Sequence, residues 1–367
     1  MKLRRLTGLL LSLVLLFCTG CSQSAAPRSA PFPTAEEQAL SSPPEDSAKA
    51  PSDQQAEETV SAEKNAPAPA QEVSFTLCAY LPVSSMTQGA AAVAEEYAGS
   101  IAALDYLVLN TGAYWDENSA LSLSDELLDA IETLQGKTAL WCTVNPQGAL
   151  IREGTAGQSI DTPQERQVLA QEIAAFAEQY GLAGIDIDWE FPLDDEWEDF
   201  STFLIALKDT LSRNSEPVAL SLALYPEEIA LSEEAIAALD RIHVMAYDQF
   251  DSEGFHSTMQ AAEDAVAYFT ALGASPQQLV LGIPAYGRPL DGSAQWVFYK
   301  GIDPESISGE NPDLVGDISF NSAATAAQKT QYALEQNLGG VMVYQLLCDR
   351  NDQDALILAC ANMAENA

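Results

Sequence analysis

The sequence contains few basic residues and almost no histidine. Its 367 residues include 16 Lys and Arg, 54 Asp and Glu and 2 His, which gives a formal net charge of −38. Because binding to phosphates needs clustered Lys and Arg, this composition excludes a nucleic-acid-binding protein. Two histidines are also too few for a His-rich metal site. The acid–base chemistry available to this chain is therefore mainly that of carboxyl groups.

Cysteine is scarce as well, and the six cysteines do not have the spacing of a metal site. We therefore predict neither a metal nor a cofactor. Cys78 and Cys142 fall in separate predicted strands, too far apart for a disulfide. Although an exported chain permits disulfides, we expect Cys78, Cys142, Cys348 and Cys360 to be free, buried thiols.

The sequence has a short apolar run near its start, after three basic residues. The run Leu6–Cys18 has 13 residues, fewer than the roughly 20 that a membrane span needs, and it fits a signal peptide. Thr19 and Gly20 then precede Cys21, which resembles a bacterial lipobox. The resemblance implies a signal peptide over 1–20, a lipid on Cys21 and an extracytoplasmic, membrane-anchored protein. Cys18 departs from the usual Leu, Val or Ile, and an ordinary secretory signal is the alternative.

Residues 21–72 have the composition of a linker. They are rich in Ala, Ser, Pro, Glu and Gln and contain almost no large apolar side chains. Such a segment cannot bury enough apolar surface to offset the entropy lost on ordering. We therefore predict a disordered, lipid-anchored tether, with the membrane contacted only through Cys21. Residues 73–367 remain for one folded domain.

Predicted strands and amphipathic helices alternate through residues 73–367. The eight strand candidates are Phe75–Leu81, Tyr106–Asn110, Thr138–Val144, Gly184–Glu190, Val218–Leu224, Ile242–Tyr247, Leu279–Pro284 and Gly340–Leu346. Eight β/α units in about 295 residues match a (β/α)₈ TIM barrel. A doubly wound open sheet is the alternative, although no Gly-x-Gly-x-x-Gly loop follows the first strand.

Helix signals support this alternation. Thr162, Pro163 and Glu165 form a capping box with proline at the first helical position, and Gly181 marks the end of that helix. Apolar residues repeat at helical spacing between these signals and again over 197–211. Between Arg288 and the predicted last helix, near residues 322–337, only about 30 irregular residues occur. This is too few for a large insertion domain, so we expect a shallow, open cleft.

The fourth predicted strand contains three alternating carboxyl groups. Asp186, Asp188 and Glu190 share one face because side chains alternate along a strand, and the Ile and Trp residues between them face the helices. In a barrel this acidic face points inward, with Glu190 nearest the carboxyl-terminal mouth. Carboxyl groups this close cannot all ionise, so at least one pKa should rise. A calcium loop has similar spacing but needs polar residues and glycine in between.

The segment Gly184–Pro192 resembles the DxDxE signature of glycoside hydrolase family 18, the chitinase-like enzymes. Further segments resemble family motifs in the same order: Met245–Asp248 the Met-x-Tyr-Asp motif, Leu281–Arg288 the strand-seven motif, and Gly339–Met342 the start of strand eight. The resemblance covers the chain from Phe75 onwards. It implies a TIM barrel and a retaining, substrate-assisted hydrolase of β-1,4-linked N-acetylglucosamine glycans.

The resemblance also assigns roles. Glu190 would protonate the glycosidic oxygen and later activate water. Asp188 would orient the substrate's 2-acetamido group, whose carbonyl oxygen is the nucleophile, and Asp186 would share a proton with Asp188. Tyr247 would donate a hydrogen bond to the acetamido oxygen, and Asp248 would help to hold the sugar.

The remaining candidate residues have weaker support. We predict substrate contacts for Met245, Tyr286, Arg288, Tyr344, Tyr80 and Trp115. Tyr286 and Arg288 are equally consistent with a packing and salt-bridge pair. His243 fits a hydrogen-bonded core residue better than a catalyst. Two departures from the family are Trp141–Asn145 in place of a Ser-x-Gly-Gly motif and Tyr344 in place of the usual tryptophan floor.

Several functions remain open at this stage. We expect a monomer that acts on chitin or chito-oligosaccharides. Peptidoglycan and the chitobiose core of N-glycans would undergo the same chemistry, and the sequence does not choose between endo and exo action. A non-catalytic sugar-binding lipoprotein is the alternative from another class, but such barrels typically lose the terminal acid, and Glu190 is present. A transporter's solute receptor would need two lobes.

Overall fold

The structure is a computed structural model that describes residues 75–307 and 311–367. The predictions of a signal peptide over 1–20, a lipid on Cys21 and a linker over 21–72 lie outside these residues. Of the helices that the structure describes, none is both long and apolar enough to cross a membrane.

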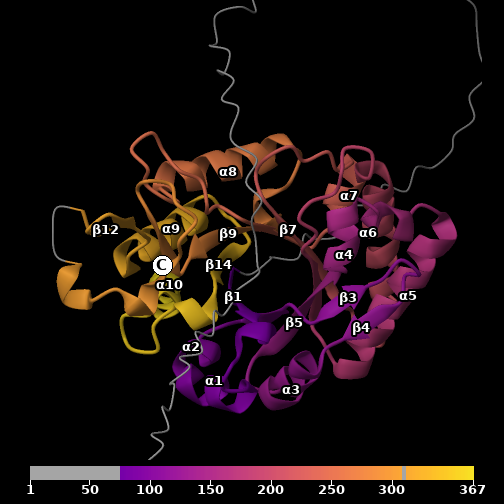
Figure 1. The fold of residues 1–367 in the computed structure, drawn as a ribbon, viewed down its shortest axis with the longest axis horizontal. Coiled ribbons are helices and arrows are strands. Elements are labelled where there is room, and N and C mark those ends of the chain that lie inside the picture. Colours follow the sequence, from indigo (N-terminus) through magenta and orange to yellow (C-terminus); the bar gives the residue numbers. More distant parts are fainter. Residues whose placement is uncertain (1–74, 308–310) are drawn as a thin grey trace, which may run out of the picture. The chain divides into compact units, whose positions relative to one another are not determined.

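Eight parallel strands in the described part of the chain form a closed barrel (Figure 1). β1 pairs with β14 and β2, and β2 also pairs with β5, which closes the ring. The barrel strands are β1 (Thr76–Pro82), β2 (Tyr106–Asn110), β5 (Ala139–Pro146), β6 (Gly184–Ile187), β7 (Ala219–Leu224), β8 (Arg241–Val244), β9 (Leu279–Pro284) and β14 (Gly340–Tyr344). The closed ring confirms the predicted TIM barrel and excludes an open sheet.

Helices cover the outside of this ring. Figure 1 shows α3, α5, α6 and α8 around the strands. The helices are α1 (Ala90–Glu96), α2 (Ala98–Ala102), α3 (Asp125–Leu134), α4 (Gly148–Glu153), α5 (Pro163–Tyr180), α6 (Trp197–Leu211), α7 (Glu233–Ala238), α8 (Met259–Ala271), α9 (Ala323–Glu335) and α10 (Leu356–Glu365).

The helix signals in the sequence correspond to α5 and α6. At the start of α5, the Thr162 side chain accepts a hydrogen bond from the Glu165 N–H, and the Glu165 carboxylate accepts one from the Thr162 N–H. Gly181 ends the helix with φ of 62°. The predicted boundaries of α5 are therefore confirmed, and the apolar repeat over 197–211 falls on α6.

Alternate side chains of the barrel strands belong to two different cores. One large apolar cluster lies between the strands and the helices. A second cluster, which we call the interior cluster, consists of Cys78, Tyr80, Tyr106, Val108, Trp141, Met245, Tyr247, Val280, Tyr286 and Met342. Gly184 makes room for one of its members, because a Cβ atom there would lie 2.1 Å from the Trp141 ring. The interior cluster surrounds the inward-facing polar side chains of β6, β7 and β8.

Three strands end earlier than predicted: β6, β8 and β14, the last of which ends at Tyr344 instead of Leu346. β6 and β8 end just before candidate site residues. β6 ends at Ile187 instead of Glu190, because the Asp188 N–H donates to the side-chain oxygen of Asn145 instead of a neighbouring backbone carbonyl. β8 ends at Val244 instead of Tyr247. The residues that follow are loops at the carboxyl-terminal mouth, where TIM-barrel sites form.

Short antiparallel strands occur outside the barrel. The segment after β9, predicted to be irregular, instead forms a small sheet of β10 (Tyr286–Pro289), β11 (Val297–Phe298), β12 (Leu314–Val315) and β13 (Ile318–Ser319). β3 (Ala113–Trp115) pairs with β4 (Leu121–Leu123) and with the end of β5. The strands of the small sheet have only two to four residues, too short for a sequence periodicity to reveal them.

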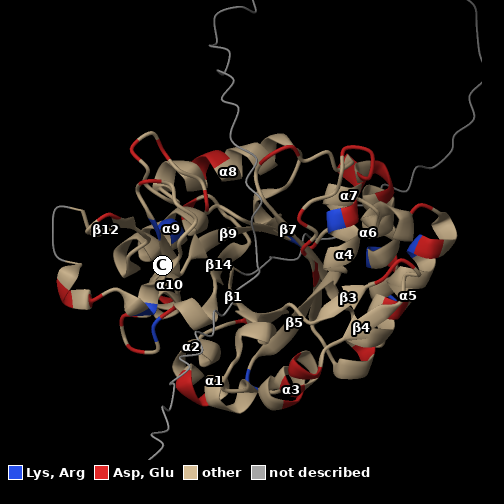
Figure 2. Cartoon of the chain, in the orientation of Figure 1, with Lys and Arg blue, Asp and Glu red and all other residues tan. Residues whose placement is uncertain are grey.

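The surface is acidic on the outer helices and loops. Figure 2 shows Asp and Glu spread over these elements, with few Lys and Arg among them. Cys78, Cys142, Cys348 and Cys360 are buried and free, as the sequence predicts. The charge is thus distributed over the exterior and does not mark a site by itself.

Candidate active site

The three carboxyl groups predicted from the sequence lie at the carboxyl end of β6. Asp186 is inside the barrel with no exposed surface, whereas Asp188 and Glu190 are half-buried. Trp189, which faces the other way, packs edge-on against Phe200 of α6 with ring centroids 5.1 Å apart. The alternation predicted from the sequence is therefore confirmed, and it carries the acidic side chains from the interior to the mouth.

Asp186 is held by three side chains from three other strands. Tyr80 on β1 donates to Oδ2 at 2.8 Å, and Ser221 on β7 donates to Oδ1 at 2.5 Å. His243 Nδ1 on β8 lies 3.2 Å from Oδ1. A buried carboxyl group costs free energy unless such partners satisfy it. His243 is itself fully buried and hydrogen-bonded, as predicted.

Asp188 is a carboxyl group that favours its protonated form. Burial raises its pKa well above the usual value, and the neighbouring charges of Glu190 and Asp186 raise it further. The hydrogen bond with Asn145 acts in the opposite direction. Asn145 is one of the residues that replace the usual strand-three motif, so this departure supplies a contact to the backbone of Asp188.

Tyr247 and Tyr344 form an aromatic pair beside the carboxyl groups. Their rings are stacked with centroids 5.5 Å apart and an interplanar angle of 25°. Burial and the nearby Tyr344 and Asp188 raise the pKa of Tyr247 well above 10. Its hydroxyl therefore keeps its proton at neutral pH and remains a hydrogen-bond donor. Met245 precedes this pair and is buried in the interior cluster.

Asp248 has a separate set of partners at the end of β8. Tyr286 donates to Oδ2 at 2.8 Å, Arg288 Nη1 contacts Oδ1, and the Asp248 N–H donates to His256 Nε2 at 2.9 Å. Burial raises the pKa of Asp248, but the contacts of His256, Tyr286 and Arg288 outweigh it, and the pKa lies below its usual value. Asp248 therefore stays ionised under conditions in which Asp188 retains a proton.

Comparison with known proteins agrees with this geometry. A sequence profile of glycosyl hydrolases family 18 matches residues 59–349, which is most of the chain. The chain belongs to glycosyl hydrolase family 18. Probable chitinase 2 of Drosophila melanogaster is 23% identical over 241 residues, which is 49% of this chain and 50% of the fly protein. The chain thus spans about half the length of this relative.

Solved structures agree on the fold. The family 18 chitinase ChiB of Flavobacterium johnsoniae superposes with a TM-score of 0.66 at 21% identity, covering 80% of this chain and 94% of ChiB. A family 18 chitinase of Cycas revoluta, in complex with (GlcNAc)4, gives a TM-score of 0.62 at 20% identity, covering 78% of this chain and 99% of the plant protein. At these identities the likeness shows the barrel alone.

Three residues of this family 18 chain that were predicted to contact substrate are instead buried inside the fold. Trp115 is fully buried outside the barrel interior, where its Nε1–H donates to Ser159 Oγ at 2.9 Å and its ring meets Trp189 edge-on. Tyr80 is almost fully buried and binds Asp186. Tyr286 has no exposed surface and binds Asp248. Trp115 is therefore a core residue, and the two tyrosines position carboxylates, because each hydroxyl finds its partner inside the fold.

Sequence reasoning missed Trp296, Ser221 and His256. Trp296 lies between β10 and β11 and stacks on Tyr286 with ring centroids 3.8 Å apart, and its edge faces Tyr344 at 6.3 Å. Nothing in its local sequence distinguishes it from a loop residue. Ser221 could have been found, because it is the single polar residue inward of an apolar strand and pairs in register with Asp186.

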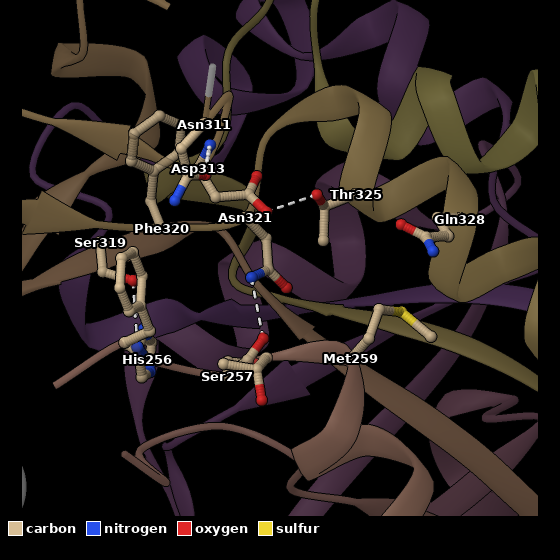
Figure 3. Close-up of a pocket in the computed structure, with 12 residues that line it drawn as sticks. His256, Ser257, Met259, Asn311, Asp313, Ser319, Phe320, Asn321, Thr325 and Gln328 are labelled. Carbon is tan, nitrogen blue, oxygen red and sulfur yellow. Dashed lines mark hydrogen bonds between the residues drawn. The ribbon is translucent and has the colours of Figure 1, made fainter. Parts of the chain in front are cut away.

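A cavity of about 300 Å³ with many polar lining residues includes His256, the partner of Asp248, in its wall (Figure 3). Residues from the start of α8, such as Ser257 and Met259, and from the segment leading into α9, such as Asp313 and Asn321, line it. Figure 3 shows the hydrogen bond from the Asn321 amide to Ser257 O, 3.0 Å long. Across residues 75–307 and 311–367, no cluster of three His, Cys, Asp or Glu side chains is arranged to hold a metal ion.

Proposed function

We propose that this chain hydrolyses β-1,4-linked N-acetylglucosamine glycans such as chitin or chito-oligosaccharides, with retention of configuration. The observation that carries the proposal is the position of Asp188, with its raised pKa, between Asp186 and Glu190 at the barrel mouth. A row of carboxyl groups that cannot all ionise keeps a proton available near neutral pH.

The proposed reaction uses the substrate's own 2-acetamido group. Glu190 donates a proton to the glycosidic oxygen while the C1–O bond breaks and the acetamido carbonyl oxygen bonds to C1. Asp188 accepts a hydrogen bond from the acetamido N–H and stabilises the positive oxazolinium ion. Tyr247 donates to the acetamido oxygen. Water then attacks C1, Glu190 takes its proton, and the acetamido group is restored.

Exposed aromatic side chains near the carboxyl groups support a sugar substrate. Trp296 is half-buried beside Tyr344, and Phe191, directly after Glu190, is 47% exposed. Aromatic faces offer the apolar contact that sugar rings require. Trp296 also supplies an indole close to Tyr344, which stands where the family commonly has a tryptophan. We propose that Trp296 takes part of that tryptophan's role.

The substrate class follows the named relatives and remains a proposal for this chain. The fly relative is named a chitinase, and the Cycas structure contains (GlcNAc)4. We also propose that the protein acts as a monomer anchored through a lipid on Cys21, facing the outside of a bacterial cell membrane. The support for the anchor is the basic, apolar and small-residue order of positions 1–21.

The test is product analysis by mass spectrometry on chitin oligomers, peptidoglycan and N-glycans. We expect shortened chitin oligomers from the wild type, and a loss of rate of at least about 10²-fold in Glu190→Gln with binding retained. Products from peptidoglycan or N-glycans alone would change the substrate but keep the chemistry. Binding without products in the wild type would show a sugar-binding protein, and full activity in Glu190→Gln would refute the mechanism.

A further inference from the structure

His243 is bonded at both ring nitrogens inside the barrel. Nδ1 lies 2.6 Å from Tyr80 Oη and 3.2 Å from Asp186 Oδ1, and Nε2 lies 2.9 Å from Tyr106 Oη. The ring has no exposed surface. It stacks on Tyr106 and tilts against Trp141, with centroids 5.9 and 6.0 Å away. The ring is therefore fixed, and only the positions of the protons on it can change.

The proton of Tyr80 connects His243 with Asp186. Tyr80 Oη is within hydrogen-bond distance of both His243 Nδ1 and Asp186 Oδ2, at 2.6 and 2.8 Å. One hydroxyl proton can be donated to only one of them. If Asp186 is ionised, Tyr80 donates to Asp186 and Nδ1 carries a proton. If Asp186 is protonated, it donates to Tyr80, Tyr80 donates to Nδ1, and Nε2–H donates to Tyr106.

The ionisable surroundings of His243 come from the strands packed around it. Asp186 and then Asp188 lie on the β6 side, Tyr80 and Cys78 on β1, and Tyr106 on β2. Arg241, on the same strand as His243, is a cation that acts on Tyr106 and Cys78. β5 and β7 contribute the uncharged Trp141 and Ser221. Among these neighbours the carboxyl groups of Asp186 and Asp188 are therefore the partners with which His243 can exchange a proton.

We propose that His243 is a positioning residue that exchanges, through Tyr80, the proton shared by Asp186 and Asp188. In this step the Tyr80 hydroxyl proton moves to His243 Nδ1 while the carboxyl proton of Asp186 moves to the Tyr80 oxygen. Two O–H bonds break, and one N–H and one O–H bond form. The products are an imidazolium and a carboxylate, with all heavy atoms in place.

The catalytic role of this proton exchange rests on the proposed function, the hydrolysis through an oxazolinium ion. The oxazolinium intermediate is positive, and Asp188 stabilises it best when ionised. If the shared proton can rest on His243, both Asp186 and Asp188 can carry charge while the proton stays in the barrel. The alternative is that His243 only fills space and anchors two tyrosines, which would affect stability but not the response to pH.

The first experiment compares His243→Asn with wild type and with Val108→Ala. Asparagine keeps a short amide near Tyr80 and Asp186 but cannot take up a proton. We expect kcat to fall about tenfold, less than a general acid contributes, with little change in KM. The acidic limb of the kcat/KM profile should move to higher pH, because the carboxyl pair alone must hold the proton. Val108→Ala, a loss of packing in the same interior cluster, should lower stability and leave the limb in place.

Nitrogen-15 NMR of wild type provides a second measurement that does not depend on His243→Asn folding or on activity. The chain has only two histidines, so a His256→Gln sample assigns both. We expect the His243 nitrogen shifts to change between pH 4 and pH 9, and the change to differ in Asp186→Asn. A neutral His243 with one unchanging tautomer, or an unmoved acidic limb in folded His243→Asn, overturns the inference. Absence of all hydrolysis in wild type would instead refute the proposed function.

Discussion

Two aspartates of the site, Asp186 and Asp248, have almost the same kinds of partners but differ in one of them. Asp186 is bound by a tyrosine, a serine and a histidine, and Asp248 by a tyrosine, a histidine and an arginine. Each site uses one of the chain's two histidines. The difference is a cation: Arg288 contacts Asp248, whereas the structure shows no Lys or Arg ion pair with Asp186 among the described residues.

These partners determine what each group of side chains can do. With His256, Tyr286 and Arg288 beside it, Asp248 has a lowered pKa and a fixed negative charge, which suits holding a neutral hydroxyl or amide. Without a cation, the row of Asp186, Asp188 and Glu190 keeps a proton, and the pKa of Asp188 rises. We therefore expect substitutions in the row to change kcat, and substitutions around Asp248 to change KM and stability.

The largest expected effect is that of Asp188→Asn. Asparagine keeps the shape but cannot carry the charge that stabilises the oxazolinium ion. We expect kcat on a fluorogenic chitobioside to fall by about 10²-fold or more, with KM changed much less. Asp248→Asn is the matched comparison and should affect KM more than kcat. If Asp248→Asn reduces kcat more than Asp188→Asn, the division between the two regions is wrong.

Arg288→Met should have a smaller effect, mainly on KM and stability. Methionine keeps much of the apolar stem and removes the charge, so Asp248 loses its cation. Because the fold lowers the pKa of Asp248, the interaction stabilises the protein above about pH 4 and is lost as the pH falls through the folded pKa. We expect a loss of about 1 kcal/mol at pH 7 that shrinks toward pH 3, measured by urea unfolding.

A matched control for this loss is Arg213→Met. Arg213, just after the end of α6, forms an exposed ion pair with Asp209 four residues earlier, with 3.5 Å between Nη2 and Oδ2. Such pairs contribute about 0.5 kcal/mol or less. An equal loss in the two variants at pH 7, or a loss in Arg288→Met that does not depend on pH, would contradict the role assigned to the Arg288–Asp248 pair.

Trp296→Ala tests whether the small sheet beside Asp248 contributes to sugar binding. The indole stacks on Tyr286 and meets Tyr344 edge-on, so its removal opens the aromatic wall without touching a carboxyl group. A stacking contact of about 1 kcal/mol corresponds to about a fivefold rise in KM. Trp296→Phe should restore most of the affinity. A fall in kcat at constant KM would exclude a binding role for this side chain.

The sequence predicted those features of the fold and the site that depend on local pattern. The alternation of Asp186, Asp188 and Glu190 and the capping box at Thr162 are short-range signals, and both are present in the structure. The side chains that each predicted residue contacts in the fold could not be predicted in the same way. Trp115 looked like a sugar contact, yet it is buried because β3 pairs with β5.

The early ends of the strands and the position of Trp296 could not be predicted either, because they too depend on contacts between distant segments. The hydrogen bond from Asp188 N–H to the Asn145 side chain joins residues 43 positions apart, and β6 ends just before Asp188. Trp296 becomes part of the site only when β10 and β11 pair. Contacts between distant segments thus determined where each predicted side chain finally points.

Lys329 gives a third case, a buried cation whose hydrogen bonds go to neutral atoms. It lies on α9 without exposed surface, and Nζ donates to Ser257 O at 2.8 Å and to Ser257 Oγ at 2.9 Å. Burial lowers its pKa from 10.5 to about 7, although Asp313 acts in the opposite direction. Arg288 has the carboxylate of Asp248 to balance its charge. Lys329 forms its hydrogen bonds with neutral atoms of Ser257, and it loses its proton more easily than an exposed lysine.

This contrast predicts a pH dependence of stability without an effect on catalysis. Between about pH 7 and pH 10.5 the unfolded chain binds a proton on Lys329 that the folded chain does not, so the contribution of Lys329 to stability rises with pH in this window by roughly a few kcal/mol. The buried thiols, whose pKa values are raised by burial, act in the opposite direction above about pH 9 in wild type and in Lys329→Met alike. Urea midpoints measured with reductant present should therefore increase from pH 7 to pH 10 in wild type relative to Lys329→Met, while hydrolysis stays unchanged. Parallel profiles for the two proteins would show that Lys329 is charged in the fold, and that a cation here needs no carboxylate partner.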